Sequence, residues 1–181
     1  ESNISSCVYN NVQSTLRLCE AITESSVESM TLVSTDKAVR PTNVMGASKR
    51  VCELIVQGFS EESSSAIFSM VRFGNVLNSS GSVIPKFKKQ ISRGGPLSVT
   101  HPDVTRYFMT IEEAASLVLS SSTIAKGGEV FLLDMGEEIN IYNLAKKLIL
   151  LSGHEYASSH TANGIEIEIT GLRPGEKLQE E

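Results

Sequence analysis

The sequence has no glycine before Gly46, although its 181 residues include 13 glycines. It also has no tryptophan, and no apolar run approaches the ~18–20 residues that a membrane-spanning helix needs. Its three cysteines, Cys7, Cys19 and Cys52, are odd in number and lack CxxC spacing, which argues against a disulfide framework or a zinc site. The net charge of −5 argues against a nucleic-acid-binding protein. These absences favour a globular chain in a reducing, cytoplasmic compartment.

Short apolar segments alternate with amphipathic helical segments along the chain. Residues 30–34, 66–72 and 129–133 are apolar runs typical of buried strands. Buried strands that alternate with helices predict a parallel α/β sheet. Gly58 and the Ser/Glu tract at 60–65 are expected to end the second of the predicted helices. These helices are 8–23, 42–57, 82–93, 111–123 and 141–151, with short extended pieces at 97–99, 106–110 and 165–169.

Polar side chains follow the first predicted strand, where residues 34–37 read Ser-Thr-Asp-Lys. Ligands of parallel α/β sheets bind beyond the carboxyl ends of the strands, so these residues are candidates for chemistry. Met45 and Lys49 are four residues apart on the next helix and share one of its faces. A hydroxyl, a carboxylate and an amine facing a helical lysine could form an acid–base site. The alternative is a turn and helix cap with two solvated lysines, and spacing alone favours that alternative.

The motif S-T-D-K-A-V-R-P-T-N-V-M-G-A-S-K-R, residues 34–50, resembles the active-site segment of extended short-chain dehydrogenase/reductases. Within them it is similar to the nucleotide-sugar 4,6-dehydratases of the CapD/WbpM-like polysaccharide-biosynthesis group. The Tyr-x-x-x-Lys of the superfamily reads here as Met45-Gly46-Ala47-Ser48-Lys49. Methionine at the tyrosine position is typical of the long, often membrane-anchored UDP-N-acetylglucosamine 4,6-dehydratases. The resemblance favours chemistry at this cluster over a turn and cap.

Four further segments resemble the same family and occur in the family's order. Asn11 matches the structural asparagine of the superfamily, although an exposed helix residue is an equal interpretation. Asn78 and Gln179 depart from the family, which usually has glycine and tyrosine there. The segments are 10–15 (NNVQST), 72–87 (RFGNVLNSSGSVIPKF), 100–111 (THPDVTRYFMTI) and 172–181 (LRPGEKLQEE).

By resemblance, the fold is the C-terminal part of a Rossmann-like doubly wound parallel sheet with a small mixed α/β substrate-binding subdomain. The nucleotide-binding part would comprise 1–75 and 107–134, and the sugar-nucleotide subdomain 76–106 and 135–181. A dinucleotide site needs a glycine-rich turn after the first strand of the sheet, and nothing before Gly46 can supply it. The N-terminal cofactor half is therefore expected to be absent, and the isolated chain to be an inactive fragment.

The family reaction removes water from a nucleotide sugar. Hydride passes from C4 of the sugar to NAD⁺ or NADP⁺, water is eliminated across C5 and C6, and the hydride returns to C6. The resemblance implies that Thr35 hydrogen-bonds the C4 oxygen, Asp36 protonates the departing C6 hydroxyl and Lys37 is the base at C5. A lysine is a base only when neutral, which an ion pair opposes, so the site is expected to separate Asp36 from Lys37 or to desolvate Lys37. Met45 cannot transfer a proton, so the C4 proton is expected to leave through Thr35 with water or through Asp36.

The resemblance implies a bound NAD or NADP and a UDP-sugar substrate. Lys49 would bind the hydroxyls of the nicotinamide ribose. Arginines would bind the diphosphate, although a surface salt bridge is an equal interpretation for each of them. The cofactor would be contacted by Ser34, Lys49, Arg72 and Phe73, and the substrate by Asn75, Ser82, Val83, Arg106, Arg173 and Glu176.

Other functions stay open from the sequence alone. A 4-epimerase of the same superfamily would not need the Asp36-Lys37 pair for elimination, and a non-catalytic fragment could simply bind a UDP-sugar. Helices 8–23 and 42–57 could join two chains into a homo-oligomer. The basic residues of 82–93, including Lys86, are expected on a solvated helix face. A metal is not expected, because the histidines lack ligand spacing: His101, His154 and His160.

Overall fold

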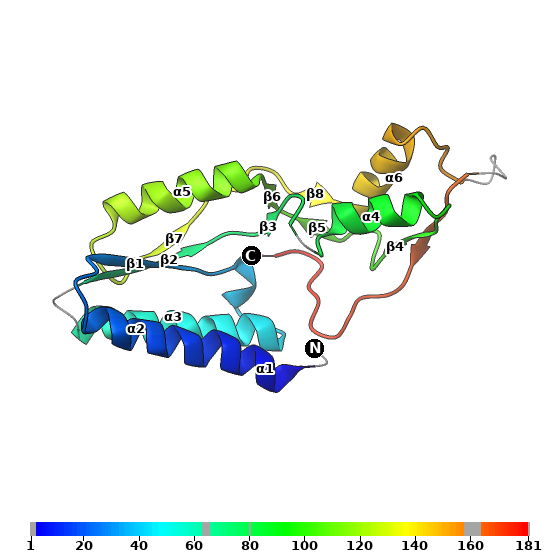
Figure 1. The fold of residues 1–181 in the computed structure, drawn as a ribbon. Coiled ribbons are helices and arrows are strands. Elements are labelled where there is room, and N and C mark those ends of the chain that lie inside the picture. Colours follow the sequence, from blue (N-terminus) through cyan, green and yellow to red (C-terminus); the bar gives the residue numbers. More distant parts are fainter. Residues whose placement is uncertain (1–2, 63–65, 80, 158–163, 181) are drawn as a thin grey trace. The chain divides into compact units, whose positions relative to one another are not determined.

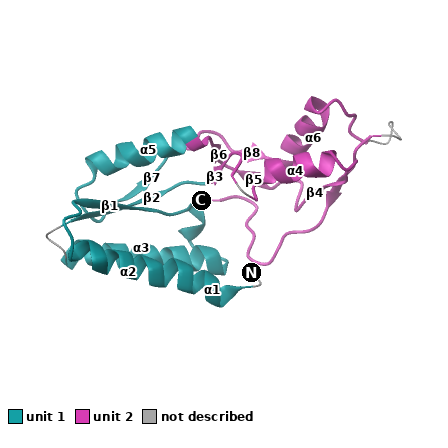
Figure 2. Cartoon of the chain, viewed as in Figure 1, with its two compact units in different colours: residues 1–74, 112–134, 181 teal, residues 75–111, 135–180 magenta. Residues whose placement is uncertain are grey.

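The computed structural model describes residues 3–62, 66–79, 81–157 and 164–180. The chain divides into two compact units (Figure 2). Each unit has its own buried apolar cluster. His160, one of the three histidines considered above, lies outside the described residues. Unit 1 comprises 1–74 and 112–134, and unit 2 comprises 75–111 and 135–180.

Unit 1 is built on a parallel sheet of β1 (Ser29–Val33), β2 (Ile67–Arg72) and β7 (Val130–Leu132), in that order (Figure 1). The register places Met30 opposite Phe68 on the first pair of strands. On the second pair, Met70 lies opposite Val130. The prediction of a parallel α/β sheet is confirmed.

Helices cover both faces of this sheet. α2 (Ser14–Thr23) and α3 (Val44–Glu62) lie on one face, and α5 (Ile111–Ile124) lies on the other (Figure 1). Burial and the neighbouring Cys52 raise the pKa of the Cys19 thiol to about 11, so this cysteine packs as an apolar side chain. The buried cluster between α2, α3 and the sheet contains Cys19, Leu32, Cys52, Val56, Phe68 and Met70.

Two sequence predictions for unit 1 are wrong. Helix α3 does not end at Gly58 but continues to Glu62, inside the Ser/Glu tract, because Phe59 packs against the apolar cluster and outweighs the low helix propensity of glycine. The third strand is not buried, since Val130 and Leu132 are 39% and 71% exposed. Its position at the edge of the described sheet explains this exposure, because apolar composition alone cannot distinguish an edge strand from a central one.

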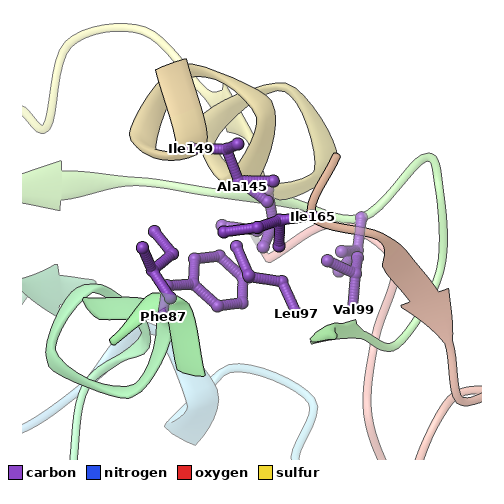
Figure 3. Close-up of a cluster of buried hydrophobic side chains, with 9 residues drawn as sticks. Phe87, Leu97, Val99, Ala145, Ile149 and Ile165 are labelled. Carbon is purple, nitrogen blue, oxygen red and sulfur yellow. The ribbon is translucent and has the colours of Figure 1, made fainter. Parts of the chain in front are cut away.

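Unit 2 combines three short strand pairs with α4 (Val83–Ile91) and α6 (Ile141–Leu151). Its apolar cluster includes Phe87 from α4, Leu97 from a strand and Ile149 from α6, all fully buried (Figure 3). The pairs are β3 (Asn75–Val76) with β6 (Phe108–Met109), β4 (Leu97–Val99) with β9 (Ile167–Ile169), and β5 (Thr105–Arg106) with β8 (Ile139–Asn140). In this order, the first two pairs are parallel and the third is antiparallel.

The helical segment before β1 is longer than predicted and changes from α-helical to π-helical geometry and back. It begins with α1 (Ile4–Val8), takes a π-helical turn over Tyr9–Gln13, and continues as α2. Such π-turns are rare and often lie at functional sites. In the described parts of the chain, every helix is too short or too polar to cross a bilayer.

Candidate functional site

The segment after β1 forms a tight turn that β2 holds in place. Asp36–Ala38 is a 3₁₀ helix, and its N-cap residue is Thr35. The Ser34 amide donates to the Val71 carbonyl at 2.7 Å, and the Asp36 amide donates to the Phe73 carbonyl at 3.2 Å. The turn that carries the predicted catalytic residues is therefore fixed at the carboxyl edge of the sheet, where ligands of α/β folds bind.

Thr35, Asp36 and Lys37 converge on one carboxylate oxygen. Thr35 Oγ1 donates to Asp36 Oδ1 at 2.8 Å, and Lys37 Nζ donates to the same oxygen at 2.9 Å. Of the two expected alternatives, separation of Asp36 from Lys37 does not occur, whereas the Lys37 side chain is only 21% exposed and thus partly shielded from water. The second oxygen, Asp36 Oδ2, is buried without a hydrogen-bond partner among the described residues. An orphaned buried carboxylate oxygen is available for a proton or a ligand hydroxyl.

Helix α3 brings Met45 and Lys49 to the same edge. Lys49 Nζ donates to the Val33 carbonyl at 3.0 Å, which places its charge at the end of β1. Met45 is 39% exposed, so it does not fill the core. The close approach depends on Gly46, because a β-carbon there would lie 3.0 Å from the carbonyl carbon of Lys37 and closer still to its oxygen.

The π-turn before β1 also reaches α3. Asn11 Nδ2 donates to Ser48 Oγ at 2.8 Å, and Ser48 Oγ donates to the Met45 carbonyl at 2.9 Å. Asn11 is therefore joined to the helix that carries Met45 and Lys49. Its interpretation as a structural asparagine agrees with this contact better than a purely exposed position does.

A buried ion-pair network that the sequence analysis missed lies behind the turn. Glu53 of α3 binds Ser34 and Arg72, and its side chain is 1% exposed. Burial alone would raise the pKa of the Glu53 carboxyl, but hydrogen bonds from Arg72, Ser34 and Arg50 and the charge of Arg72 hold that pKa below its usual value. The four-residue spacing from Lys49 could have drawn attention to Glu53.

Unit 2 contains a separate pocket of about 180 Å³. Of the predicted substrate residues it brings together Asn75, Val83, Arg106, Arg173 and Glu176. Ser82 lies between two lining residues, Gly81 and Val83, and its buried Oγ has no hydrogen-bond partner in the described part of the chain.

Lys86 also lines this pocket, although it is exposed, as expected for a solvated helix face. Burial lowers the pKa of the Lys86 ammonium, and the charge of Arg173 lowers it further while Glu176 opposes the change. Two neighbouring cations in one pocket favour an anionic ligand. Nothing in the sequence distinguishes Lys86 from Lys88 and Lys89 on the same helix.

Arg106 and Glu176 organise the C-terminal segment around the pocket. Glu176 Oε1 accepts hydrogen bonds from Thr100 Oγ1 at 2.8 Å and from Arg106 Nη2 at 3.2 Å, and Arg106 Nη1 also donates to the Leu178 carbonyl. The Arg173 amide donates to Glu176 Oε2 at 3.1 Å. Within the described residues, no cluster of three or more metal-ligating side chains occurs.

Sequence comparison identifies the family of this chain. The family model described as "Polysaccharide biosynthesis protein" matches residues 1–181. The chain belongs to this polysaccharide biosynthesis protein family. The capsular polysaccharide biosynthesis protein CapD of Staphylococcus aureus is 52% identical over 181 residues, which are 100% of this chain and 29% of that protein. The predicted resemblance to the CapD-like group is therefore confirmed.

Two more distant relatives are named as enzymes. A UDP-N-acetylglucosamine 4,6-dehydratase (inverting) of Campylobacter jejuni is 32% identical over 99% of this chain and 51% of its own length. A UDP-glucose 4-epimerase of Rickettsia rickettsii is 34% identical over 96% of this chain and 48% of its own length. The chain thus spans about half or less of these curated relatives.

Solved structures agree with the Rossmann-like fold. The protein Pen of Bacillus thuringiensis superposes with a TM-score of 0.85 at 35% identity, over 98% of this chain and 56% of that one. The dTDP-glucose 4,6-dehydratase DesIV of Streptomyces venezuelae, solved with NAD bound, gives a TM-score of 0.83 at 18% identity, over 98% and 58%. The described fold therefore corresponds to part of a larger dehydratase- and epimerase-type fold.

Proposed function

We propose that this chain carries the catalytic residues of a nucleotide-sugar 4,6-dehydratase that converts UDP-N-acetylglucosamine to its 4-keto-6-deoxy sugar. The observation that carries the proposal is the cluster of Thr35, Asp36 and Lys37, where a hydroxyl, a buried carboxylate and an amine meet at the end of β1. Elimination of water needs both an acid and a base beside the sugar, and this cluster offers both. The relatedness to a UDP-N-acetylglucosamine 4,6-dehydratase supports the same substrate class.

The hydrogen bonds of the cluster offer a route for each proton. The C4 hydroxyl proton would pass through Thr35 Oγ1 to Asp36 Oδ1, along the 2.8 Å hydrogen bond. Protonated Asp36 would then donate this proton to the C6 hydroxyl, which leaves as water. The proton of the C4 hydroxyl thus ends in the released water, and Met45 is not needed as a proton carrier.

The same proton transfer would release Lys37 from its ion pair. Once Asp36 is protonated, it no longer holds Lys37 in the charged form, and Lys37 can give its resting proton to solvent. Neutral Lys37 would take the C5 proton during elimination and return it to C5 when the hydride returns to C6. Lys37 then recovers a proton from solvent, so the cycle balances.

A nicotinamide cofactor fits this edge through Lys49. An ammonium has three donors, and Lys49 uses one of them to bind the Val33 carbonyl, so ribose hydroxyls could be held beside the end of β1. Bound NAD or NADP would supply the hydride acceptor and donor. Ser34, Phe73 and Arg72 stay predicted contacts, although Glu53 binds two of the Arg72 donors, Nε and Nη2.

The substrate's diphosphate would bind in the unit 2 pocket. Arg173 and Lys86 supply positive charge there, and Arg106 contributes mainly by holding Glu176 and the segment that carries Arg173. Asn75, Ser82 and Val83 stay predicted contacts for the nucleotide. Such an enzyme would act in the cytoplasm, or at the cytoplasmic face of the inner membrane if its full-length form is membrane-anchored.

The test uses the full-length protein, in which, under this proposal, a cofactor half precedes this chain. Incubation with UDP-N-acetylglucosamine and NAD is expected to give a product lighter by one water, detected by mass spectrometry. The isolated chain is expected to bind NAD weakly and to give no product. Turnover by the isolated chain would refute the claim that the cofactor half lies elsewhere.

A 4-epimerase is the second candidate, because the relative from Rickettsia rickettsii is named as one. An epimerase would give a product of unchanged mass with inverted configuration at C4, which nuclear magnetic resonance distinguishes from the dehydrated sugar. UDP-sugar binding by calorimetry without any product would instead indicate a non-catalytic module. Either result from the full-length protein would reject the dehydratase.

We also propose a homo-oligomer that pairs α2 and α3 with a second chain. Leu18 on α2 and Leu54 on α3 are 55% and 51% exposed, although both helices bury other residues against the sheet. Leu54→Glu is expected to shift the full-length protein to a smaller species in sedimentation. Leu119→Glu on α5, where leucine is 67% exposed, is the matched control and should leave the mass unchanged. Equal masses for both variants and the parent would reject this interface.

A further inference from the structure

Glu53 is a fully buried carboxylate with no part in the proposed chemistry. It accepts hydrogen bonds from Arg72 Nε at 2.7 Å, Ser34 Oγ at 2.6 Å and Arg50 Nη1 at 2.9 Å. Arg72 Nη2 adds a second bond, so the Arg72–Glu53 pair is bidentate. A buried charge of this kind is costly unless its partners are complete, and apolar residues of similar size often stabilise a core better. Stability alone therefore does not explain the network.

The network joins the elements that build the proposed site. Glu53 lies on α3, one helical turn after Lys49. Ser34 lies directly before Thr35, and Arg72 lies directly before Phe73, whose carbonyl holds the Asp36 amide. One carboxylate thus links α3 to the ends of β1 and β2.

We propose that Glu53 is a positioning residue, which holds the Thr35–Asp36–Lys37 turn in register with α3. Its catalytic consequence rests on the proposed function, but its structural consequence does not. Removing the carboxylate would detach Ser34 and Arg72 from α3 while every group that would touch the substrate is still present. A displacement of about 1 Å at such a site can lower the rate about a hundredfold.

The test compares Glu53→Gln with Arg50→Gln in the full-length protein. Arg50 binds the same carboxylate, but from the same helix, so its loss does not separate the elements. Glu53→Gln is expected to lower kcat about a hundredfold with little change in KM, and to speed amide hydrogen exchange in 34–38. Arg50→Gln is expected to change neither. If Arg50→Gln acts like Glu53→Gln, or if Glu53→Gln changes neither readout, the proposal is wrong.

Ser34→Ala serves as the second variant if Glu53→Gln does not fold. It keeps the Glu53–Arg72 pair and removes only the bond next to Thr35, so it should also speed exchange in 34–38 and lower kcat. Weaker NAD binding with unchanged exchange would assign Ser34 to the cofactor and overturn the positioning role. If the unmodified protein dehydrates no nucleotide sugar, the proposed function fails, while the exchange results still decide the role of Glu53.

Discussion

Replacing Lys37 by alanine in the full-length protein is expected to stop elimination while leaving oxidation at C4 intact. Lys37 is the only base that the proposal offers at C5, and general bases contribute about 10²–10⁴-fold to such steps. Thr35 and Asp36 keep their 2.8 Å hydrogen bond without Lys37, so the route for the proton of the C4 hydroxyl is retained. Reduced cofactor should therefore accumulate after substrate is added, and its absorbance can be followed directly.

Solvent deuterium gives the second readout for Lys37→Ala. The unmodified protein should place deuterium at C5 when it works in heavy water, because Lys37 exchanges its proton with solvent. Lys37→Ala should leave C5 unlabelled in recovered sugar. Lys89→Ala, on the exposed side of α4, is the matched control and should behave like the parent. Full dehydratase turnover by Lys37→Ala would contradict the assignment of the base.

Asp36→Asn separates the two roles given to Asp36. An amide can neither receive the C4 proton from Thr35 nor protonate the C6 hydroxyl, so oxidation and elimination should both fail. The two variants therefore differ in one observable, since only Lys37→Ala should reduce the cofactor. Cofactor reduction by Asp36→Asn would show that another acceptor, such as water beside Thr35, takes the proton of the C4 hydroxyl.

Local pattern predicted the elements of this fold, and tertiary packing decided where they end. The parallel sheet followed from three apolar runs alternating with helices. The continuation of α3 past Gly58 could not be predicted, because it depends on Phe59 meeting a cluster assembled from α2, α3 and the sheet. The exposure of Leu132 likewise depends on the position of β7 at the edge of the described sheet.

In the candidate site, too, residues adjacent in the sequence could be predicted, whereas contacts between distant segments could not. Thr35, Asp36 and Lys37 are consecutive, so their proximity was predictable, but the sequence left open whether Asp36 and Lys37 are paired or Lys37 is only desolvated. Glu53 and Arg72 are 19 residues apart. In the sequence Glu53 has the pattern of an ordinary helix charge, and Arg72 was predicted to contact the cofactor rather than a carboxylate. Only the packing of α3 on β1 and β2 brings them together with Ser34.

Gly46→Ala is expected to be among the most damaging small substitutions in the chain. A β-carbon at this position would lie 3.0 Å from the carbonyl carbon of Lys37 and 3.3 Å from Pro41 Cβ. The obstacle is backbone of the catalytic turn, which cannot rotate away as a side chain could. Overpacking of this kind costs about 1–3 kcal/mol or more, and here it would also push Lys37 away from α3. We expect a lower melting temperature together with a loss of turnover.

Gly58→Ala is the matched control, because it makes the same change on the same helix. A β-carbon at Gly58 would meet nothing within 4 Å, so only the helix propensity changes. Alanine is favoured over glycine inside a helix by about 0.5–1 kcal/mol, and this variant should melt slightly higher than the parent with unchanged turnover. If both variants melt higher, α3 can move away from the turn without cost, and the contact between Gly46 and Lys37 does not position the site. If only Gly46→Ala loses stability and turnover, the close approach of the helix to the turn is required for both.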